Sequence, residues 1–434
     1  MGLYKVVLDR LEKYIVVLTV FSFIAGILAA SLSKNFVSIV NSAVSTFIDL
    51  YGYLAPLAIF IILAPSLARL LNSNAGRFGS YAVMWLALRR LLACLWSVIF
   101  TVIIFGFPIL PKRGMAIEDA LISAFSTVIK MSYTSPFLIA IWIGIITAIL
   151  SVKISKLSWL NKLLDRASTG LENAGQFFVP LIPLFMFAIG AYVYGLPNTI
   201  SDLNSNNEFA LHPINLFGLN MDPNTALGML AIYVFGSLLI GMACFIWHFA
   251  LLLIARYKIS GFSIGYYFRN YWVRVYPLLW ATSSEVLATP LNLYLTKKYF
   301  SEIKTVVRRF IVGMGSYLNI NGTLISVFVL GGVVTTMLGI RVSLVEWLLT
   351  IPIIFILGYG VPGIPGELIL FAGPIAILLN LSESIIPVFL ALYIGLQIGL
   401  PDSFRTGNNS TDDCVCAVLL NEIYEKKYYN GEDE

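Results

Sequence analysis

Apolar stretches of about 20 residues recur along nearly all of this 434-residue chain, and they limit its fold more than any other feature. Hydrophobic residues make up 59% of the chain and charged residues 12%, against roughly a quarter charged in soluble domains. Because so much apolar surface must face lipid, we predict an all-α polytopic protein of the cell membrane, with the lipid bilayer as its surroundings. The modest net charge of +5 lies in short loops, which suggests a membrane surface rather than nucleic acid as a partner.

Ten apolar segments divide the chain into a regular first part and an irregular second part. The first six are candidate spans at 14–32, 46–70, 81–110, 118–151, 172–196 and 225–256. The last four lie at 275–296, 306–338, 343–379 and 385–421. Two of these four, 275–296 and 343–379, are interrupted. We therefore predict eight transmembrane helices plus two re-entrant helical hairpins.

Basic residues fix the orientation. They precede the first candidate span and follow the second, fourth and sixth, with examples at Lys5, Arg69, Lys153 and Arg256. The loop 197–224 contains no Lys or Arg. Since basic loops stay on the cytoplasmic side, both termini should be cytoplasmic and the number of spans even.

The two interrupted segments point to a transport site. The segment 275–296 carries TSSE and a proline inside it, and Arg274 and Lys297 flank it on both sides. The segment 343–379 is split by GVPGIPGE at 360–367. Each half is too short to span, so both segments should enter and leave on one side, and paired interruptions of this kind mark substrate sites. The alternative is a pair of ordinary spanning helices kinked at proline.

The final apolar segment contains the polar stretch PDSFRTGNNSTDD. Helical spacing places Asp402, Arg405, Asn409 and Asp413 on one face. A guanidinium in a dry cavity binds a carboxylate, and a carboxylate beside it can hold an ammonium. The pair could therefore bind an amino-dicarboxylate, or form an internal salt bridge that only stabilises the helix.

Two further polar features interrupt apolar helices. GSYLNINGT at 315–323 could unwind and expose carbonyls to a cation or a substrate, or could be a simple kink. Arg89 and Arg90 lie in the middle of a span, where at least one should find an acidic or carbonyl partner unless the span is shifted toward an interface. We find no nucleophile motif, phosphate-binding loop or metal spacing, so we expect no enzyme activity and no cofactor.

The order of these elements resembles the dicarboxylate/amino acid:cation symporters, the glutamate transporter family. Four signatures follow the family's order: a serine-rich hairpin tip, an asparagine-rich break, a Gly-Val-Pro-Gly tip and a polar last helix. The resemblance implies a homotrimer whose transport domain moves like an elevator against a scaffold domain. It places 1–256 mostly in the scaffold (trimerisation) domain, with the span 81–110 in the transport domain, and makes 257–434 the transport core.

The resemblance also assigns a substrate site. Arg405 would hold the side-chain carboxylate of the substrate and Asp402 its amino group, which favours aspartate or glutamate. The other expected substrate contacts are Thr406, Asn409, Thr323, Ser283, Ser284, Val361 and Gly363. Glu285 would lie beside the substrate. The runner-up is a C4-dicarboxylate carrier of the same fold, proton-coupled or uncoupled, and a ligand-gated anion channel or a sensor would share these sequence features.

Ion coupling is where the sequence departs from the family. The motif Asn-Met-Asp-Gly-Thr has Asn321 in place of its carboxylate, and a Thr-Ser pair of one sodium site falls on Arg89 and Arg90. The resemblance therefore suggests that Arg89, Arg90 and Asn321 replace a cation, which leaves sodium coupling reduced or altered. A second sodium site is in register with the family, formed by Gly315, Asn319, Asn409 and Asp413.

Overall fold

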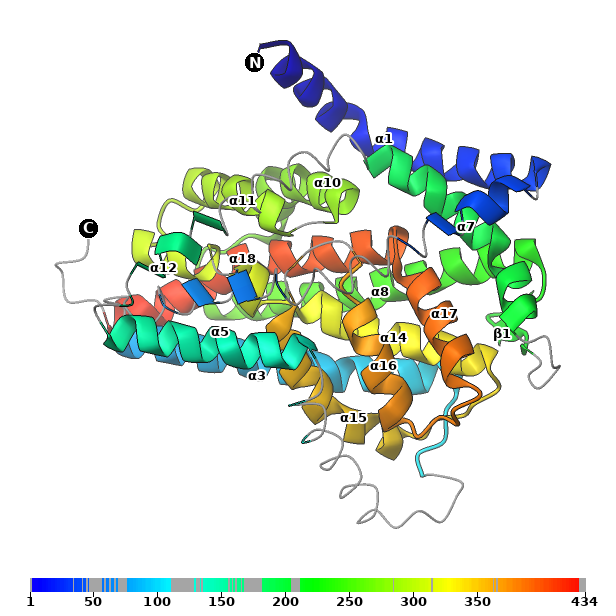
Figure 1. The fold of residues 1–434 in the computed structure, drawn as a ribbon. Coiled ribbons are helices and arrows are strands. Elements are labelled where there is room, and N and C mark those ends of the chain that lie inside the picture. Colours follow the sequence, from blue (N-terminus) through cyan, green and yellow to red (C-terminus); the bar gives the residue numbers. More distant parts are fainter. Residues whose placement is uncertain are drawn as a thin grey trace.

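The computed structural model describes residues 2–33, 35–40, 76–110, 136–154, 182–203 and 211–428 apart from 284, 314, 362, 364 and 365, with scattered residues at 42–68, 129–133 and 157–167. The first half of the described chain forms long apolar helices (Figure 1). They are α1 (Gly2–Leu32), α3 (Gly76–Phe105), α5 (Pro136–Lys153), α7 (Ile182–Leu203) and α8 (Ala226–Lys258). The side chain of Thr225 caps α8 by accepting from the backbone N–H of Gly228 over 3.0 Å, which satisfies one of the free N–H groups of the first turn.

Two of these helices, α3 and α8, are each long and apolar enough to cross a membrane within the described part of the chain. A third candidate is a bent pair of helices near the C-terminus. Several predicted spans, among them 46–70 and the first half of 118–151, lie mostly or wholly outside the described residues. The total of eight spans therefore stays a prediction, and the helical, apolar character of the chain agrees with it.

One short β-hairpin departs from the all-α prediction. In the loop without basic residues, β1 (Ile214–Leu216) pairs antiparallel with β2 (Leu219–Met221). The two residues between them, Phe217 and Gly218, have φ values of 50° and 79°. Positive φ at both turn positions matches the twist of the strands, as in a type I′ turn.

The first interrupted segment is a helix, a break and a second helix. After α9 (Ile264–Tyr267), a π-helical turn (Phe268–Trp272) leads into α10 (Val273–Thr282), and α11 (Glu285–Tyr299) follows. Ser283 ends α10 with a left-handed φ of 49°. The two helices contact each other and both contact the last helix. The predicted interruption is present, and re-entry into the membrane stays a prediction.

The second interrupted segment has the same form. It consists of α15 (Leu344–Leu357), a 3₁₀ turn (Gly358–Gly360) and α16 (Ile369–Leu378). Ser343 and Glu346 form a capping box at the start of α15, which fixes where this helix begins. The helices α15 and α16 contact each other, and the described residues between them, 358–361, 363 and 366–368, are called the α15–α16 tip below.

The segment 306–338 is broken at the predicted polar patch. Its pieces are α12 (Thr305–Ile311), α13 (Gly315–Leu318) and α14 (Asn321–Met337). The breaks on either side of α13 bring the ends of three short helices together, and α12, α13 and α14 all contact the last helix.

The last predicted helix, 385–421, is divided in two. The pieces α17 (Ile386–Gln397) and α18 (Leu400–Lys427) meet at an angle of 63°. Gly399, at the bend, has a φ of 88°. The hydroxyl of Tyr233 stabilises the bend, because it donates to the Ile398 carbonyl (2.8 Å) and accepts from the Leu400 N–H (2.9 Å). The polar stretch therefore begins a new helix instead of continuing an old one.

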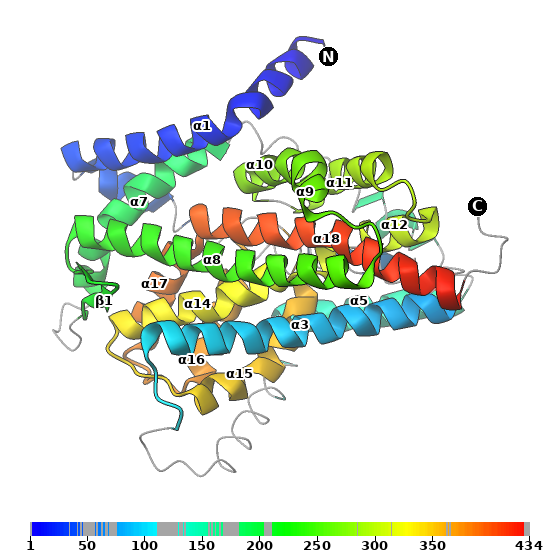
Figure 2. The same cartoon turned by 180° about the vertical axis from the view of Figure 1, so that it is seen from behind.

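The new helix α18 runs through the middle of the molecule, with α8 and α14 beside it and α10 and α11 on another side (Figures 1 and 2). Helix α3 packs on α14 and α15. The apolar side chains form two clusters, and α18 reaches both: Leu400 and Phe404 pack against one, and Cys414, Leu420 and Tyr424 are among the members of the other. The polar residues between them therefore lie where the two clusters meet.

Candidate functional site

Four predicted residues of α18 are fully or almost fully buried. Asp402, Arg405 and Asn409 are 0% exposed and Asp413 is 2% exposed. Charged and amide groups in such a place must be bonded to one another or to backbone, because each unpaired group would cost free energy. Their partners divide into two networks, one around Arg405 and one around Arg89.

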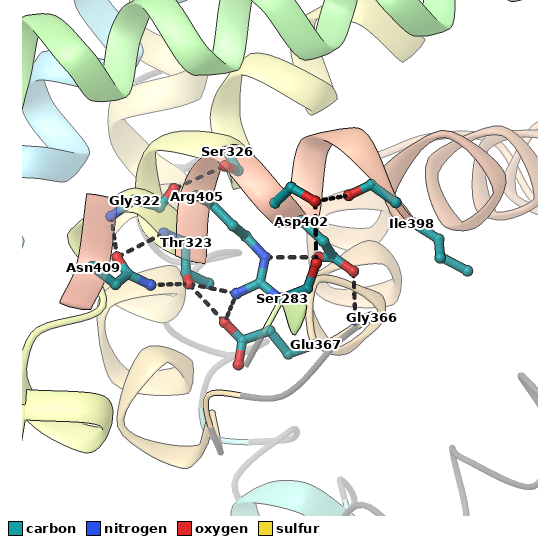
Figure 3. A network of polar contacts seen from close by, with 12 residues as sticks. Ser283, Gly322, Thr323, Ser326, Gly366, Glu367, Ile398, Asp402, Arg405 and Asn409 are labelled. Atoms are coloured by element: carbon teal, nitrogen blue, oxygen red, sulfur yellow. Dashed lines mark hydrogen bonds and ion pairs between the residues drawn. The ribbon is translucent and has the colours of Figure 1, made fainter. Parts of the chain in front are cut away.

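Arg405 lies at the centre of the first network (Figure 3). Its Nε donates to Oδ1 of Asp402 over 2.7 Å, and its Nη1 donates to Oγ1 of Thr323 over 3.0 Å. The same Nη1 also forms an ion pair with Glu367. The guanidinium is thus bound by two carboxylates, one from its own helix and one from the tip between α15 and α16.

Glu367 was not among the residues expected from the sequence. It is 0% exposed, and it accepts from the Thr323 hydroxyl over 2.6 Å and from the Gly363 N–H over 2.8 Å. A signal for it exists, because Glu367 is the only charged residue between Glu346 and Glu383. A lone acid in so long an apolar run is expensive and usually functional.

Two backbone contacts join the tips around this network. The N–H of Gly366 donates to Oδ2 of Asp402 over 2.6 Å, which ties the α15–α16 tip to α18. The N–H of Glu285 donates to the Gly363 carbonyl over 3.1 Å, which ties the two tips to each other. The interrupted segments therefore close over the same side chains of α18.

Asn409 links the network to α11 and α14. Its Nδ2 donates to Oε1 of Glu285 (2.6 Å) and to Oγ1 of Thr323 (2.9 Å), while its Oδ1 accepts from the N–H of Gly322 (2.5 Å). A side chain at Gly322 would collide with the Arg405 carbonyl, so glycine permits this close approach of α14 to α18. Glu285 lies beside the site, as expected.

The remaining expected substrate contacts do not all lie in this network. The Ser283 hydroxyl lies 3.3 Å from that of Ser403, at the edge of the network, and Ser284 lies outside the described residues. Val361 belongs to the larger apolar cluster. The hydroxyl of Thr406 is buried and has no hydrogen-bond partner among the described residues.

Arg89 lies at the centre of the second network. Its Nη2 pairs with Oδ2 of Asp412 at 2.7 Å, and its Nη1 donates to Oδ1 of Asn319 (3.1 Å) and to Sγ of Cys416 (2.6 Å). The other oxygen of Asp412 lies 2.5 Å from Nδ1 of His248. His248 is thus a buried residue with one bonded ring nitrogen.

The four residues of the expected sodium site come together, but the amide group of Asn319 does not suit a cation. Nδ2 of Asn319 donates to Oδ1 of Asp413 (2.8 Å) and to the Asn409 carbonyl (3.1 Å), and Gly315 lies against the Asp413 carboxylate. Sodium needs oxygen atoms at this point. Turning the amide round would set its NH₂ group against the guanidinium of Arg89, so in this arrangement the residues do not fit a sodium ion.

Residues 209–423 match the sequence model of the sodium:dicarboxylate symporter family. The chain belongs to this family. A comparison with curated proteins found no match. The family resemblance inferred from the motifs is therefore confirmed, and a transporter family with apolar helices makes the chain a multi-pass membrane protein. The expectation of no enzyme activity is consistent with such a family.

In this symporter-family member, all residues of the Arg405 network lie inside the matched region, whereas Arg89 comes from α3, outside it. Asn321 also joins the second network, since its Nδ2 donates to Oδ1 of Asn319 over 2.6 Å. Arg89 and Asn321 thus share one acceptor. Both were expected to replace the cation of one sodium site, and both bond to Asn319, a residue of the second expected site.

Arg90 has a different position from its neighbour. It is 0% exposed, and its guanidinium carbon lies 3.7 Å from the ring centroid of Tyr359, next to Gly358 in the α15–α16 tip. Its three nitrogen atoms have no hydrogen-bond partner among the described residues. The cation–π contact ties α3 to this tip, so only Arg89 of the pair reaches the sodium-site residues.

Proposed function

We propose that this symporter-family member is a secondary transporter of acidic amino acids, aspartate or glutamate, with reduced or altered sodium coupling. The observation that carries the proposal is the position of Arg405, where two helix tips and the break before α14 meet. A buried guanidinium there offers planar, charge-assisted bonds to a carboxylate. Tips made of irregular backbone can open without unwinding a long helix.

The reduced sodium coupling is supported by Arg89. A permanent guanidinium beside Asp412 and Asn319 supplies positive charge that a family member would otherwise take from a bound cation. It also keeps the amide oxygen of Asn319 away from Asp413. A sodium-independent carrier, driven by protons or uncoupled, would follow from this arrangement.

One observation favours the runner-up, a C4-dicarboxylate carrier of the same fold. Both oxygens of Asp402 are already engaged, one by Arg405 and the other by the Gly366 N–H. A substrate ammonium must therefore share oxygens that have partners, whereas succinate would need no such contact. A ligand-gated anion channel or a sensor would use the same binding site without net coupled flux.

The transport-domain assignment rests on packing. We place 257–434 in the moving domain, together with α3, because α3 packs on α14 and α15. Helix α8 belongs with them as well, although it ends the range first placed in the scaffold, because it packs along α18 and α14. The elevator movement, the homotrimer, the plasma membrane and the cytoplasmic termini are carried over from the family resemblance and from the basic loops.

The deciding experiment is calorimetric binding of aspartate and of succinate to purified protein, with sodium and again with potassium or choline. We expect aspartate to bind with an affinity that is nearly independent of sodium. Affinity that collapses without sodium would overturn the reduced coupling. Uptake of labelled aspartate into proteoliposomes then separates a carrier from a sensor, which binds and does not transport.

A further inference from the structure

The substrate's carboxylate is assigned to the guanidinium of Arg405. That guanidinium is already paired with a carboxylate of the protein itself, Glu367. Glu367 forms an ion pair with Arg405, and it also accepts from a hydroxyl and from a backbone N–H, so three donors surround one carboxylate. These are the kinds of contact expected around a bound carboxylate ligand. Glu367 sits at the tip between α15 and α16, and its carboxylate faces Arg405 and Thr323 (Figure 3).

The number of charges around Arg405 makes this contact consequential. Three acidic residues face the region: Asp402 on α18, Glu285 on α11 and Glu367 itself. Glu285 is bonded to Asn409, and its N–H joins the same tip at Gly363. Arg405 is the one positive charge bonded in this network among the described residues.

A ligand carboxylate cannot simply be added to this arrangement. It would put a third carboxylate beside one buried guanidinium, and like charges repel strongly where water is excluded. The ligand can bind Arg405 only if Glu367 moves away. A displaced carboxylate stays buried cheaply only in its neutral, protonated form, or it must follow the tip into water.

We propose that Glu367 is a built-in competitor of the substrate for Arg405, and that it carries a proton when the substrate displaces it. This inference rests on the proposed function and adds to it the coupling ion, a proton, and the residue that carries it. Water on the open side supplies the proton to a carboxylate oxygen of Glu367. When the substrate leaves on the other side, the proton returns to water and Glu367 pairs with Arg405 again.

The same contact links substrate binding to the tip. While Glu367 holds Arg405, the neighbouring Gly366 N–H holds Asp402, so the tip is locked onto α18 without any ligand. A substrate that removes Glu367 takes away the stronger, ionic half of this lock. The tip would then be held by the ligand instead. The site would thus be closed either by Glu367 or by the substrate, and an open, empty site would not move across the membrane.

The test is binding of aspartate and succinate to wild type and to Glu367→Gln by calorimetry, over a range of pH and in buffers of different ionisation enthalpy. Gln keeps an oxygen acceptor for Thr323 and Gly363 and loses the competing charge. We expect Glu367→Gln to bind at least about tenfold more tightly near neutral pH, a change of about 1.4 kcal/mol. Wild type should take up close to one proton per ligand, whereas the variant should take up almost none.

The sign of the pH effect follows from the proton uptake. Wild-type affinity should fall as pH rises, because fewer protons are available to neutralise the displaced Glu367, and this slope should flatten in Glu367→Gln. Glu383→Gln, in the exposed turn after α16, is the matched control and should behave as wild type. Glu367→Asp, with its charge drawn back by one methylene, should lie between wild type and Gln.

The outcomes separate the two ideas. If wild type binds and Glu367→Gln keeps the same affinity, pH slope and proton uptake, Glu367 is a permanent partner of Arg405 and the inference is wrong, while the proposed function stands. If no acidic ligand binds to wild type or to either Glu367 variant at any pH, the proposed function fails and the inference falls with it. Should Glu367→Gln not fold, the proton uptake of wild type and of Glu367→Asp decides.

Discussion

The guanidinium of Arg89 donates from Nη1 to Oδ1 of Asn319 over 3.1 Å, and this bond decides which way round the Asn319 amide lies. With its oxygen facing Arg89, the amide presents its NH₂ group to Asp413. A family site that would bind a cation through oxygens is thereby converted into a hydrogen-bonded pair. The proposed reduction of sodium coupling therefore rests on a residue of α3, which lies outside the matched region.

Restoring the family residues at this point should restore sodium dependence. In Arg89→Thr combined with Asn321→Asp, a hydroxyl and a carboxylate replace the guanidinium and the amide, so oxygen atoms again face Asn319. We expect aspartate affinity to rise by at least about tenfold when sodium replaces choline. Calorimetry in the two salts measures this directly.

Arg90→Ser is the matched control for that experiment. Arg90 stacks on Tyr359 and does not reach Asn319, so its replacement alone should add no sodium dependence. An equal gain from Arg90→Ser, or no gain from a folded Arg89→Thr/Asn321→Asp variant, would contradict the role given to Arg89.

The contributions of Arg89 and Asp412 to the free energy of unfolding should be coupled, because the two side chains form a buried ion pair. Both side chains are buried, at 8% and 0% exposed, so Asp412→Ala leaves a buried guanidinium without its carboxylate. Removing one partner of such a pair costs about 3–5 kcal/mol, whereas replacing both by apolar residues often costs little. We expect Asp412→Ala to lower the unfolding temperature in detergent sharply, and Arg89→Met/Asp412→Leu to recover much of the loss.

A surface pair provides the comparison. Glu422 and Lys426 form an exposed pair one turn apart on α18, and pairs of this kind contribute about 0–1 kcal/mol. Glu422→Ala should therefore leave the unfolding temperature almost unchanged.

The result for the buried pair can contradict this reasoning. If the double variant at 89 and 412 is less stable than Asp412→Ala alone, the two side chains are not energetically coupled in the manner described.

Local patterns predicted what depends on local geometry. The one-face spacing of Asp402, Arg405 and Asn409 follows from the helix period, and the structure brings these side chains into one network. The Gly- and Pro-rich stretch 360–367 predicted the break in the second tip, because those residues disfavour a continuous helix. In the first tip the break falls at TSSE, and Pro290 lies inside α11. The bend before α18 had a similar signal, since Gly399 followed by Pro401 marks the end of one helix and the start of another.

What the sequence did not predict depends on packing between distant segments. Glu367 and Arg405 are 38 residues apart in different segments, so no helical spacing in the sequence predicts that their side chains meet. Arg89 and Arg90 are adjacent, so sequence treated them alike, yet the turn of 100° between neighbours sends one to Asp412 and the other to Tyr359. Only the arrangement of α3, α15 and α18 separates these roles.

Arg405 should be indispensable for dicarboxylate binding. Arg405→Ala removes the charge and leaves Asp402 and Glu367 as unpaired buried carboxylates, so we expect no measurable binding of aspartate or succinate. Arg405→Lys keeps the charge and loses the planar fork, and should bind more weakly by about tenfold or more. Unchanged affinity in a folded Arg405→Ala variant would show that the ligand binds elsewhere.

Asp402 should distinguish an amino acid from a simple dicarboxylate. Asp402→Asn keeps an oxygen that can accept from the Gly366 N–H and removes the negative charge that would hold an ammonium. If the substrate is an acidic amino acid, aspartate should lose at least about tenfold more affinity than succinate, because succinate has no ammonium to bind. Calorimetry with both ligands on wild type, Asp402→Asn and Asp402→Ala measures the ratio. Equal losses for the two ligands would mean that Asp402 serves only to hold Arg405 and the tip, and would favour the C4-dicarboxylate carrier.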